Sequence, residues 1–454
     1  MDVSFFQEIL TKISDRGRQI LDLSFIGGGE QESIESLCQA LTSSRGEAMG
    51  VALARNILDR YLSFEDSEKS TFFAFLARDL QPKSDNIFRA AKAYLDDPNS
   101  KTLELLTESV ESPRQELLRR LNLAPGGTRA LVRMRQDLLS QSKQIPNFSE
   151  IDRDFVHLFS SWFNRGFLVL ARISWASPAS ILEKIIDYEA VHEIKGWDDL
   201  RRRLDPHDRR CFAFFHPALN DEPLIFVEVA LDHEIPGSIH SLLETEGGPE
   251  NAPIAPSVAI FYSISNCQEG LKGISFGNFL IKQVVEDLKK DIPSLRTFVT
   301  LSPAPGYKPW LYRALDSGQL SYFSDPQKEL LEKLRHQGWS EAEQFQDALR
   351  PIITAGAAHY FLLAKDKTGK PLDPVARFHL GNGARLERID WLGDTSEKGV
   401  RQALSIMVNY RYELRDIEGN HEAYVNQGTV AASKAVRSTL LAPEKSRSLV
   451  PAKE

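Results

Sequence analysis

Three glycines separate a strand-like segment from a helical one, and their spacing suits an anion-binding loop. Gly270, Gly273 and Gly277 follow a β-branched and aromatic run at residues 258–264 and overlap the start of a helical pattern at residues 276–288. Glycine lets the backbone approach a ligand closely, and the free N–H groups at a helix start can bind a pyrophosphate. The alternative is that these glycines only shape a turn and a close helix contact.

The same loop lacks the marks of two common nucleotide sites. It has no Gly-Lys-Ser/Thr ending, whose lysine and hydroxyl hold phosphate and magnesium in a P-loop. It also lacks the G-x-G-x-x-G spacing of a dinucleotide-binding fold. ATPase and dinucleotide functions are therefore disfavoured, whereas a phosphate-bearing ligand of another kind is not.

Ser302 and His379 are the candidate catalytic side chains. Ser302 follows a strand-like segment at residues 297–301, and a strand, helix and strand in this order predict a right-handed parallel crossover. Ser302 would then lie beside the glycine loop, at the strand ends where open sheets bind ligands. His379 is expected one residue before the end of a strand at residues 375–380, on a face that can line a cleft.

Each of these residues also has an ordinary structural interpretation. Ser302 could simply start the Pro-Gly turn that follows it, and a single histidine among ten is usually structural or solvated. No Gly-x-Ser-x-Gly motif surrounds Ser302, which argues against a serine hydrolase.

Composition and charge limit the class of protein. A chain of 454 residues with 42% apolar and 26% charged residues predicts a soluble globular protein of two domains. The net charge of −8 disfavours a nucleic-acid-binding surface. Cys38, Cys211 and Cys267 lie far apart without a C-x-x-C motif, which argues against a zinc cluster and suits a reducing compartment. No apolar run approaches the roughly 20 residues of a membrane span.

Two regions with different patterns position these residues. Residues 1–165 have the helical period almost throughout and predict a helical bundle, interpreted as an assembly domain. Residues 166–440 alternate strand-like and helical segments and predict a mixed α/β domain. Residues 441–454, rich in Pro, Lys and Ser, predict a flexible tail.

Within the second region, several segments are assigned from their local patterns. An Asn-Gly pair at Asn382 predicts a β-hairpin. Residues 409–412 are expected to close a helix that begins near Ser396, with their aromatic rings in the core or a tyrosine hydroxyl reaching a cleft. The predicted strands are residues 211–216, 224–231, 258–265, 297–301, 359–363 and 375–380.

Four segments, in this order, resemble the malonyl-CoA decarboxylase family. They are FYSISNCQEGLKGISFGNFLIKQVVEDL, FVTLSPAPGYKPWL, VARFHLGNGARLERIDWLGD and VNYRYEL. The resemblance covers most of residues 165–430 and is weaker in the helical half. It implies a catalytic domain similar to the Gcn5-related N-acetyltransferase (GNAT) fold, whose glycine loop holds the pyrophosphate of coenzyme A.

The resemblance also assigns residues by motif. Ser302 and His379 match the family's catalytic pair, and Tyr412 matches a site tyrosine. The segment that matches the family's acyl-CoA-binding residues comprises Lys272, Gly273, Ile274, Ser275, Phe276, Gly277 and Asn278. Ser275 stands where some relatives, including the animal enzymes, carry a glutamate, so a role for that acid does not transfer to this chain.

The activity implied by the resemblance is decarboxylation of malonyl-CoA to acetyl-CoA and carbon dioxide. The thioester carbonyl accepts the electrons as an enolate, so no biotin, pyridoxal phosphate or metal is required in principle. Ser302 would orient the malonyl group and His379 would protonate the enolate as a general acid, although the reverse division of roles is open. An unperturbed histidine pKa near ~6.5 would give an alkaline fall in rate, unless burial or the bound carboxylate shifts it.

Two other functions use the same binding chemistry. One is a CoA-dependent acyltransferase, and the other is a non-catalytic acyl-CoA-binding regulator. The family resemblance further implies a homo-oligomer, with a tetramer suspected, assembled through the helical domain. The chain ends in Pro-Ala-Lys-Glu without a Ser-Lys-Leu peroxisomal signal, which favours the cytoplasm of a bacterium.

Overall fold

The computed structural model describes residues 32–43, 46–243, 255–274, 276, 280–337, 339 and 345–440. The chain divides into two compact units. The helical unit comprises Met1–Val169, Phe214–Leu224 and Cys267–Phe276. The α/β unit comprises Leu170–Ala213, Ile225–Asn266 and Gly277–Glu454. Within the described ranges, no helix has the length and apolar character needed to span a membrane.

The helical unit is built from short helices that bury an aromatic and aliphatic core. Ser112 starts one of them by accepting a hydrogen bond from the backbone N–H of Gln115, with proline at the next position. Tyr61 packs against Phe72, with ring centroids 5.3 Å apart, and both side chains are fully buried. The helices are α2 Ile34–Thr42, α3 Glu47–Leu62, α4 Asp66–Asp79, α5 Ser84–Asp96, α6 Ser100–Val110, α7 Pro113–Leu121, α8 Gly127–Ser140 and α9 Phe148–Trp162. The predicted helical character of this half is confirmed.

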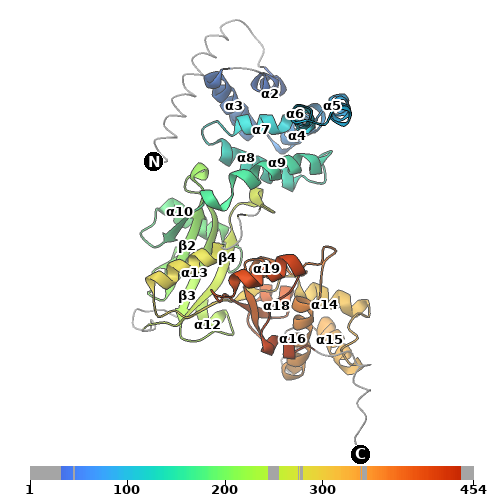
Figure 1. Cartoon of the computed structure of the whole chain (residues 1–454). Coiled ribbons are helices and arrows are strands. Elements are labelled where there is room, and N and C mark those ends of the chain that lie inside the picture. The colour runs from blue at the N-terminus through green and yellow to red at the C-terminus, as the bar shows by residue number, and fades with distance from the viewer. Residues whose placement is uncertain are drawn as a thin grey trace, which may run out of the picture. The chain divides into compact units, whose positions relative to one another are not determined.

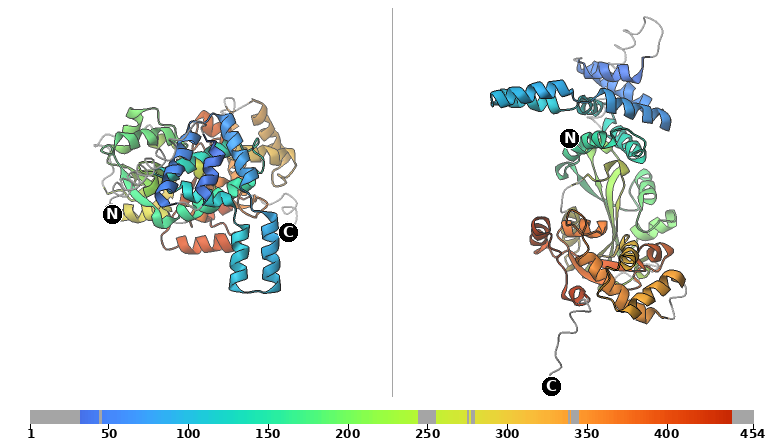
Figure 2. Two further views of the ribbon diagram at one scale, coloured as in Figure 1. Left: turned by 90° about the horizontal axis from the view of Figure 1, so that it is seen from above. Right: turned by 90° about the vertical axis from the view of Figure 1, so that its right-hand side faces the viewer.

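Helices α5 and α6 form a hairpin with little core of its own. Figure 2 shows this antiparallel pair extending away from the other helices of the unit. Ala90 is the buried residue of α5, and α6 buries none. Phe88 and Leu95 are 72% and 77% exposed. The hairpin therefore presents large apolar side chains to solvent.

The α/β unit is organised around one mixed sheet. Its strands are β1 Val169–Ile173, β2 Arg209–Phe215, β3 Pro223–Asp232, β4 Val258–Asn266, β5 Thr297–Thr300, β6 Ser302–Pro303, β7 Arg385–Asp390 and β8 Met407–Arg411. The strand order is β1-β2-β3-β4-β5-β8-β6, and β7 pairs with β8. Strands β4 and β5 are parallel, with Val258 opposite Thr297. The predicted mixed α/β domain and its parallel crossover are confirmed.

The helices of the α/β unit bury apolar side chains. Helix α13 connects β4 to β5, buries Leu280, Val284 and Leu288, and lies beside β3 and β4 in Figure 1. The helices are α10 Ala179–Tyr188, α11 Trp197–Leu204, α12 His240–Leu243, α13 Leu280–Asp291, α14 Tyr307–Asp316, α15 Asp325–Gln337, α16 Gln346–Leu362, α17 Pro374–Gly381, α18 Glu397–Ala403, α19 Ile417–Gln427 and α20 Lys434–Ser438.

Two predicted strands are helical in the structure. Residues 359–363 close α16, and residues 375–380 lie inside α17. Asp373 explains the second case, because its side chain accepts from the backbone N–H of Ala376 and Pro374 occupies the first helical turn. These start signals override the β-branched and aromatic composition of the segment.

The predicted hairpin and the predicted closing helix are also wrong. Asn382 ends helix α17, and Gly383 adopts φ +80° where a Cβ atom would lie 2.1 Å from the carbonyl oxygen of Ile417. Residues 409–411 belong to β8, because α18 ends at Ala403. The next two residues, Leu404 and Ser405, are both in the left-handed region, with φ values of 51° and 64°.

Candidate active site

Ser302 lies where the sequence predicts, immediately beyond the carboxyl end of a sheet strand. It begins β6, two residues after β5 ends, and pairs with Val408 of β8. Its side chain is buried. Because β4 and β5 run parallel, this is the edge at which open sheets bind ligands.

His379 comes from helix α17 rather than from a strand, yet it meets Ser302. Its Nε2 lies 3.2 Å from Ser302 Oγ, and its Nδ1 lies 2.8 Å from the hydroxyl of Tyr412. The imidazole also stacks on the ring of Tyr410, with centroids 4.6 Å apart and planes 23° apart. The structure thus brings together three residues that the family motifs single out.

Thr300 is a fourth member of this group that sequence reasoning missed. Ser302 Oγ donates to Thr300 Oγ1 over 2.8 Å, and the backbone N–H of Tyr410 donates to the same oxygen over 3.1 Å. Thr300 and Ser302 are two residues apart in an extended segment, which places both side chains on one face. That spacing was the available signal. We call Thr300, Ser302, His379 and Tyr412 the hydroxyl-imidazole chain.

The proton positions in the hydroxyl-imidazole chain follow from its hydrogen bonds. A serine hydroxyl has one proton, and Ser302 donates it to Thr300. The contact between Ser302 and His379 therefore uses an N–H on Nε2 as the donor. A neutral imidazole with a proton on Nε2 has an acceptor at Nδ1, which the Tyr412 hydroxyl satisfies.

The hydroxyl-imidazole chain is buried and carries no carboxylate. His379 is 2% exposed, and burial lowers the pKa of its imidazole to about 3. Burial also raises the pKa of the Tyr412 hydroxyl well above its usual value. His379 is therefore neutral near pH 7 in the free protein, and burial is one of the two influences expected from the sequence to be able to shift its pKa. A neutral set of oriented hydrogen-bonding side chains of this kind can stabilise a developing oxyanion or deliver a proton.

Helix α17 is fixed at its start by a buried acid. Asp373 Oδ1 accepts from the N–H of Ala376 over 2.8 Å, and Asp373 Oδ2 accepts from the Tyr360 hydroxyl over 3.2 Å. Burial raises the pKa of this fully buried carboxyl to about 6. These contacts hold the first turn of the helix that carries His379.

The glycine loop contains one glycine required for packing and one required for a turn. A Cβ atom on Gly270 would lie 1.9 Å from the carbonyl oxygen of Val132, so only glycine fits against α8. Gly273 has φ +80° with no neighbouring atom within 4 Å of a Cβ position. Arg135 Nη1 holds the loop by donating to the carbonyl oxygens of Gly270 and Lys272 over 2.7 and 2.9 Å. The close-contact interpretation therefore holds for Gly270.

The anion-binding interpretation of this loop stays a prediction. Lys272, Gly273, Ile274 and Phe276 are described, whereas Ser275, Gly277 and Asn278 lie outside the described residues. The backbone N–H groups of Lys272 and Ile274 already donate within the loop, each over 3.0 Å. The N–H groups that an anion would use must therefore come from other positions in the segment.

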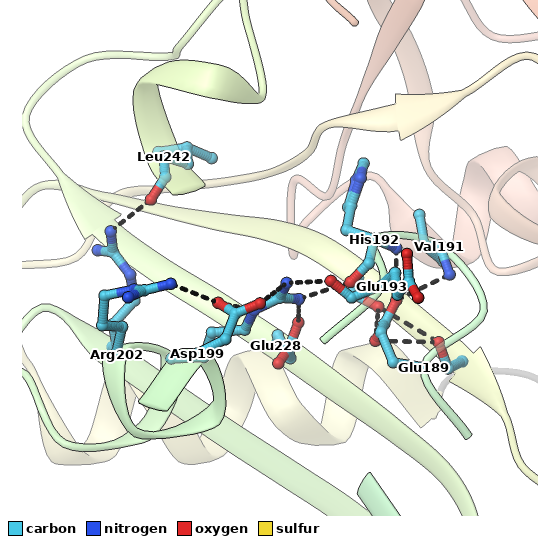
Figure 3. Close-up of polar contacts among 12 residues, drawn as sticks. Glu189, Val191, His192, Glu193, Asp199, Arg202, Glu228 and Leu242 are labelled. Atoms are coloured by element: carbon cyan, nitrogen blue, oxygen red, sulfur yellow. Dashed lines mark hydrogen bonds and ion pairs between the residues drawn. The ribbon is translucent and has the colours of Figure 1, made fainter. Parts of the chain in front are cut away.

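A second polar cluster in the α/β unit was also missed by sequence reasoning. Figure 3 shows Glu189 beside Val191 and His192, and Glu228 close to Asp199. Glu189 accepts from the N–H groups of Val191 and His192, both over 2.7 Å, and from the Ser263 hydroxyl over 2.7 Å. These bonds attach the loop after α10 to strand β4.

Arg203 is the centre of this second cluster. Its guanidinium donates to the carbonyl oxygens of His192 and Glu193 over 2.8 and 3.0 Å, and to Glu228 Oε2 over 3.2 Å. Burial raises the pKa of the fully buried Glu228 carboxyl, whereas Arg203 opposes this shift. We call Glu189, Asp199, Arg203 and Glu228 the arginine cluster. Its bonds are made within the protein, which is typical of a structural role.

In the part of the chain that the structure describes, no group of three or more His, Cys, Asp or Glu side chains is arranged to hold a metal ion.

Comparisons with known proteins agree with the motifs around this site. The malonyl-CoA decarboxylase C-terminal domain family matches residues 166–450, and the malonyl-CoA decarboxylase N-terminal domain family matches residues 80–163. The mitochondrial malonyl-CoA decarboxylase of Anser anser anser is 39% identical over 356 residues, which cover 72% of this chain and 69% of that protein.

Solved structures give the same result over a larger share of the chain. The malonyl-CoA decarboxylase of Rhodopseudomonas palustris is 52% identical and superposes with a TM-score of 0.85, covering 89% of this chain and 98% of that one. The Agrobacterium vitis protein of the same name is 52% identical, with a TM-score of 0.83 and coverage of 89% and 99%. The chain therefore belongs to the malonyl-CoA decarboxylase family.

Proposed function

We propose that this protein decarboxylates malonyl-CoA to acetyl-CoA and carbon dioxide, with Ser302 and His379 acting on the malonyl group. The observation that carries the proposal is the buried contact between Ser302 Oγ and His379 Nε2, at 3.2 Å and immediately beyond the end of β5. Family membership supports the reaction, and this contact supports the residues.

The proposed reaction breaks one carbon-carbon bond and forms one carbon-hydrogen bond. The malonyl carboxylate leaves as carbon dioxide, and the bonding electrons pass to the thioester as an enolate. The α-carbon then takes a proton to give acetyl-CoA. Ser302 orients the malonyl group by hydrogen bonding, and His379 supplies the proton from Nε2.

The burial of His379 suggests when it takes up that proton. Its pKa is lowered in the free protein, so it binds substrate as a neutral imidazole. A malonyl carboxylate nearby favours the imidazolium and raises the pKa again. Substrate binding would then draw one proton from solvent, which His379 later passes to the α-carbon. The reverse assignment, with Ser302 as the proton donor, predicts no such uptake.

We further propose that the glycine loop binds the acyl-CoA. Gly273 supports this by its positive φ and by the open space around its Cβ position. The residues proposed for this role are Lys272, Gly273, Ile274, Ser275, Phe276, Gly277 and Asn278, with Tyr412 at the acyl end.

A single incubation tests the reaction. The purified full chain is mixed with malonyl-CoA and no acceptor, and acetyl-CoA and carbon dioxide are measured. A decarboxylase releases both, whereas an acyltransferase without its acceptor or a binding protein releases neither. We expect turnover to survive rigorous chelation and added avidin, because enolate formation on the thioester needs neither metal nor biotin. Loss of turnover on chelation, restored by one metal, would contradict that part of the proposal.

We propose that residues 1–165 act as an assembly domain for a homo-oligomer, with a tetramer suspected, and residues 166–440 as the catalytic domain. The exposed Phe88 and Leu95 of the α5–α6 hairpin support a protein contact. Light scattering at micromolar concentration tests this, because a monomeric mass would contradict it. Replacement of both side chains by glutamate should lower the mass if the hairpin makes the contact.

We propose the bacterial cytoplasm as the place of action. The support is that two relatives at 52% identity come from bacteria. Fractionation of the source cells would test this.

A further inference from the structure

A large cleft in the α/β unit is lined by residues outside the hydroxyl-imidazole chain. Its volume is about 970 Å³, and its lining includes Trp310 and Arg313 of α14, Tyr322, His359 of α16, and Lys365. Neither Ser302 nor His379 lines it. Small-molecule sites commonly have volumes in this range.

Two polar atoms of the cleft residues have no partner. The Nζ of Lys365 and the hydroxyl of Tyr322 are both buried and make no hydrogen bond within the described ranges. A buried donor without a partner costs free energy, which a bound acceptor would recover. Burial also lowers the pKa of Lys365, and an anion beside it would raise that pKa again.

The acids near the cleft are already engaged elsewhere. Asp316 also lines the cleft, and its carboxylate accepts two hydrogen bonds from Arg335, over 2.7 and 2.8 Å. Asp366 accepts from the Thr368 hydroxyl over 2.6 Å and pairs with Arg377 at 3.6 Å. Lys365 and Arg313 therefore leave an excess of positive charge at the cleft that these acids do not balance.

Aromatic groups form another part of the wall. The Tyr322 ring and the His359 imidazole are stacked, with centroids 3.5 Å apart and planes 2° apart. Trp310 contributes a second flat surface from α14. Flat rings beside cations favour a ligand that combines a planar ring with a negative charge.

We propose that this cleft binds a small organic anion of nucleotide size, separate from the malonyl-CoA site. Lys365 Nζ and Arg313 contact its negatively charged group, and the Tyr322 hydroxyl adds a hydrogen bond. The planar ring lies against Trp310 or the face of Tyr322 turned away from His359. A free nucleoside phosphate and the nucleotide end of coenzyme A share this chemistry, and the experiment distinguishes them.

Adenosine monophosphate is the first probe, titrated into the full chain by calorimetry. We expect saturable binding with a Kd below about 1 mM. Lys365→Met should weaken it by about ten- to a hundredfold, because a charge-assisted hydrogen bond is lost. Tyr322→Phe keeps the ring and should weaken binding less. Lys367→Met removes an exposed lysine that does not line the cleft and should leave binding unchanged.

The steady-state constants for malonyl-CoA separate the two sources of the anion. We expect the Lys365→Met enzyme to keep the parent kcat and KM, whether or not the assignment of Ser302 and His379 holds. A KM that rises in parallel with the weakened probe binding would place the cleft in the substrate site and overturn the proposal. Absence of binding to the folded parent chain, or equal weakening in Lys367→Met, would overturn it as well. Thermal unfolding of each variant verifies that it is folded.

Discussion

The α/β unit contains two sets of buried polar residues, the arginine cluster and the hydroxyl-imidazole chain, and their hydrogen bonds serve different purposes. The arginine cluster joins a permanent cation to carboxyl groups and loop carbonyls, and its bonds attach one loop to the sheet. The hydroxyl-imidazole chain has no carboxylate and keeps a neutral histidine between two hydroxyl groups. The first arrangement suits a structural role, whereas the second suits proton transfer. Loss of a member should therefore affect stability in one group and turnover in the other.

The largest effect is expected at His379. His379→Asn keeps a hydrogen-bonding side chain of similar size and removes the acid, so kcat should fall by about 10²- to 10⁴-fold. Affinity for malonyl-CoA should change little, because the proposed pyrophosphate contacts lie in the glycine loop. His207→Asn, at an exposed position, is the control. A folded His379→Asn enzyme with the parent kcat would refute the assignment and leave Tyr412 as the next donor to test.

The arginine cluster should respond in stability instead. Arg203→Met removes donors from two carbonyls and two carboxyl groups, so the free energy of unfolding should fall by about 3–5 kcal/mol. Turnover per folded molecule should be unchanged. Urea unfolding and active-site titration measure the two quantities. Arg202→Met is the matched control, because Arg202 is exposed and donates a hydrogen bond of 3.3 Å to Asp199. Equal loss of stability in both variants would contradict the comparison.

Ser302→Ala is expected to lower kcat by about 10²-fold, because it removes the hydroxyl proposed to orient the malonyl group. Combined with His379→Asn, the loss should be smaller than the product of the single losses, since the two side chains act together. If the two losses in kcat multiply fully, the side chains act independently. That result would contradict the proposal that Ser302 and His379 act together in the hydroxyl-imidazole chain.

Thr300 should have a smaller effect, because it positions Ser302 rather than touching substrate. Thr300→Val preserves the shape but removes the acceptor, and kcat should fall by about three- to tenfold. KM should stay constant, and Thr300→Ser should restore the rate. A loss in stability without a change in kcat, or a failure of serine to rescue, would assign Thr300 a purely structural role.

The smallest effect is the pH dependence of stability that His379 contributes. Its pKa is near 3 in the folded protein and near ~6.5 when unfolded, so the unfolded chain binds more protons between these values. Stability should therefore fall as pH drops below 6.5, with a contribution of about 0.7 kcal/mol between pH 7 and pH 6. Unfolding of the parent and of His379→Asn at both pH values measures the difference. Equal pH dependence in the two proteins would contradict the buried neutral state.

The sequence by itself determined the class of each region and the position of Ser302. Helical periodicity is local, so it identified the helices of the first half without knowledge of their partners. The order of strand, glycine loop, helix and strand specified a parallel crossover, because connections of this kind obey a handedness rule. Several long motifs in one order were enough to indicate the family, although each glycine alone had a structural explanation.

The tertiary structure alone decided how His379 reaches Ser302. These residues are 77 positions apart in the chain, and no local pattern encodes their distance. The segment around His379 is rich in strand-forming residues, yet the buried cap at Asp373 makes it helical. Arg203 was missed for the same reason, since its role depends on partners from other elements. Thr300 was missed although its two-residue spacing from Ser302 could be read from the sequence. The lowered pKa of His379 likewise arises from burial, which exists only once the fold has removed the imidazole from water.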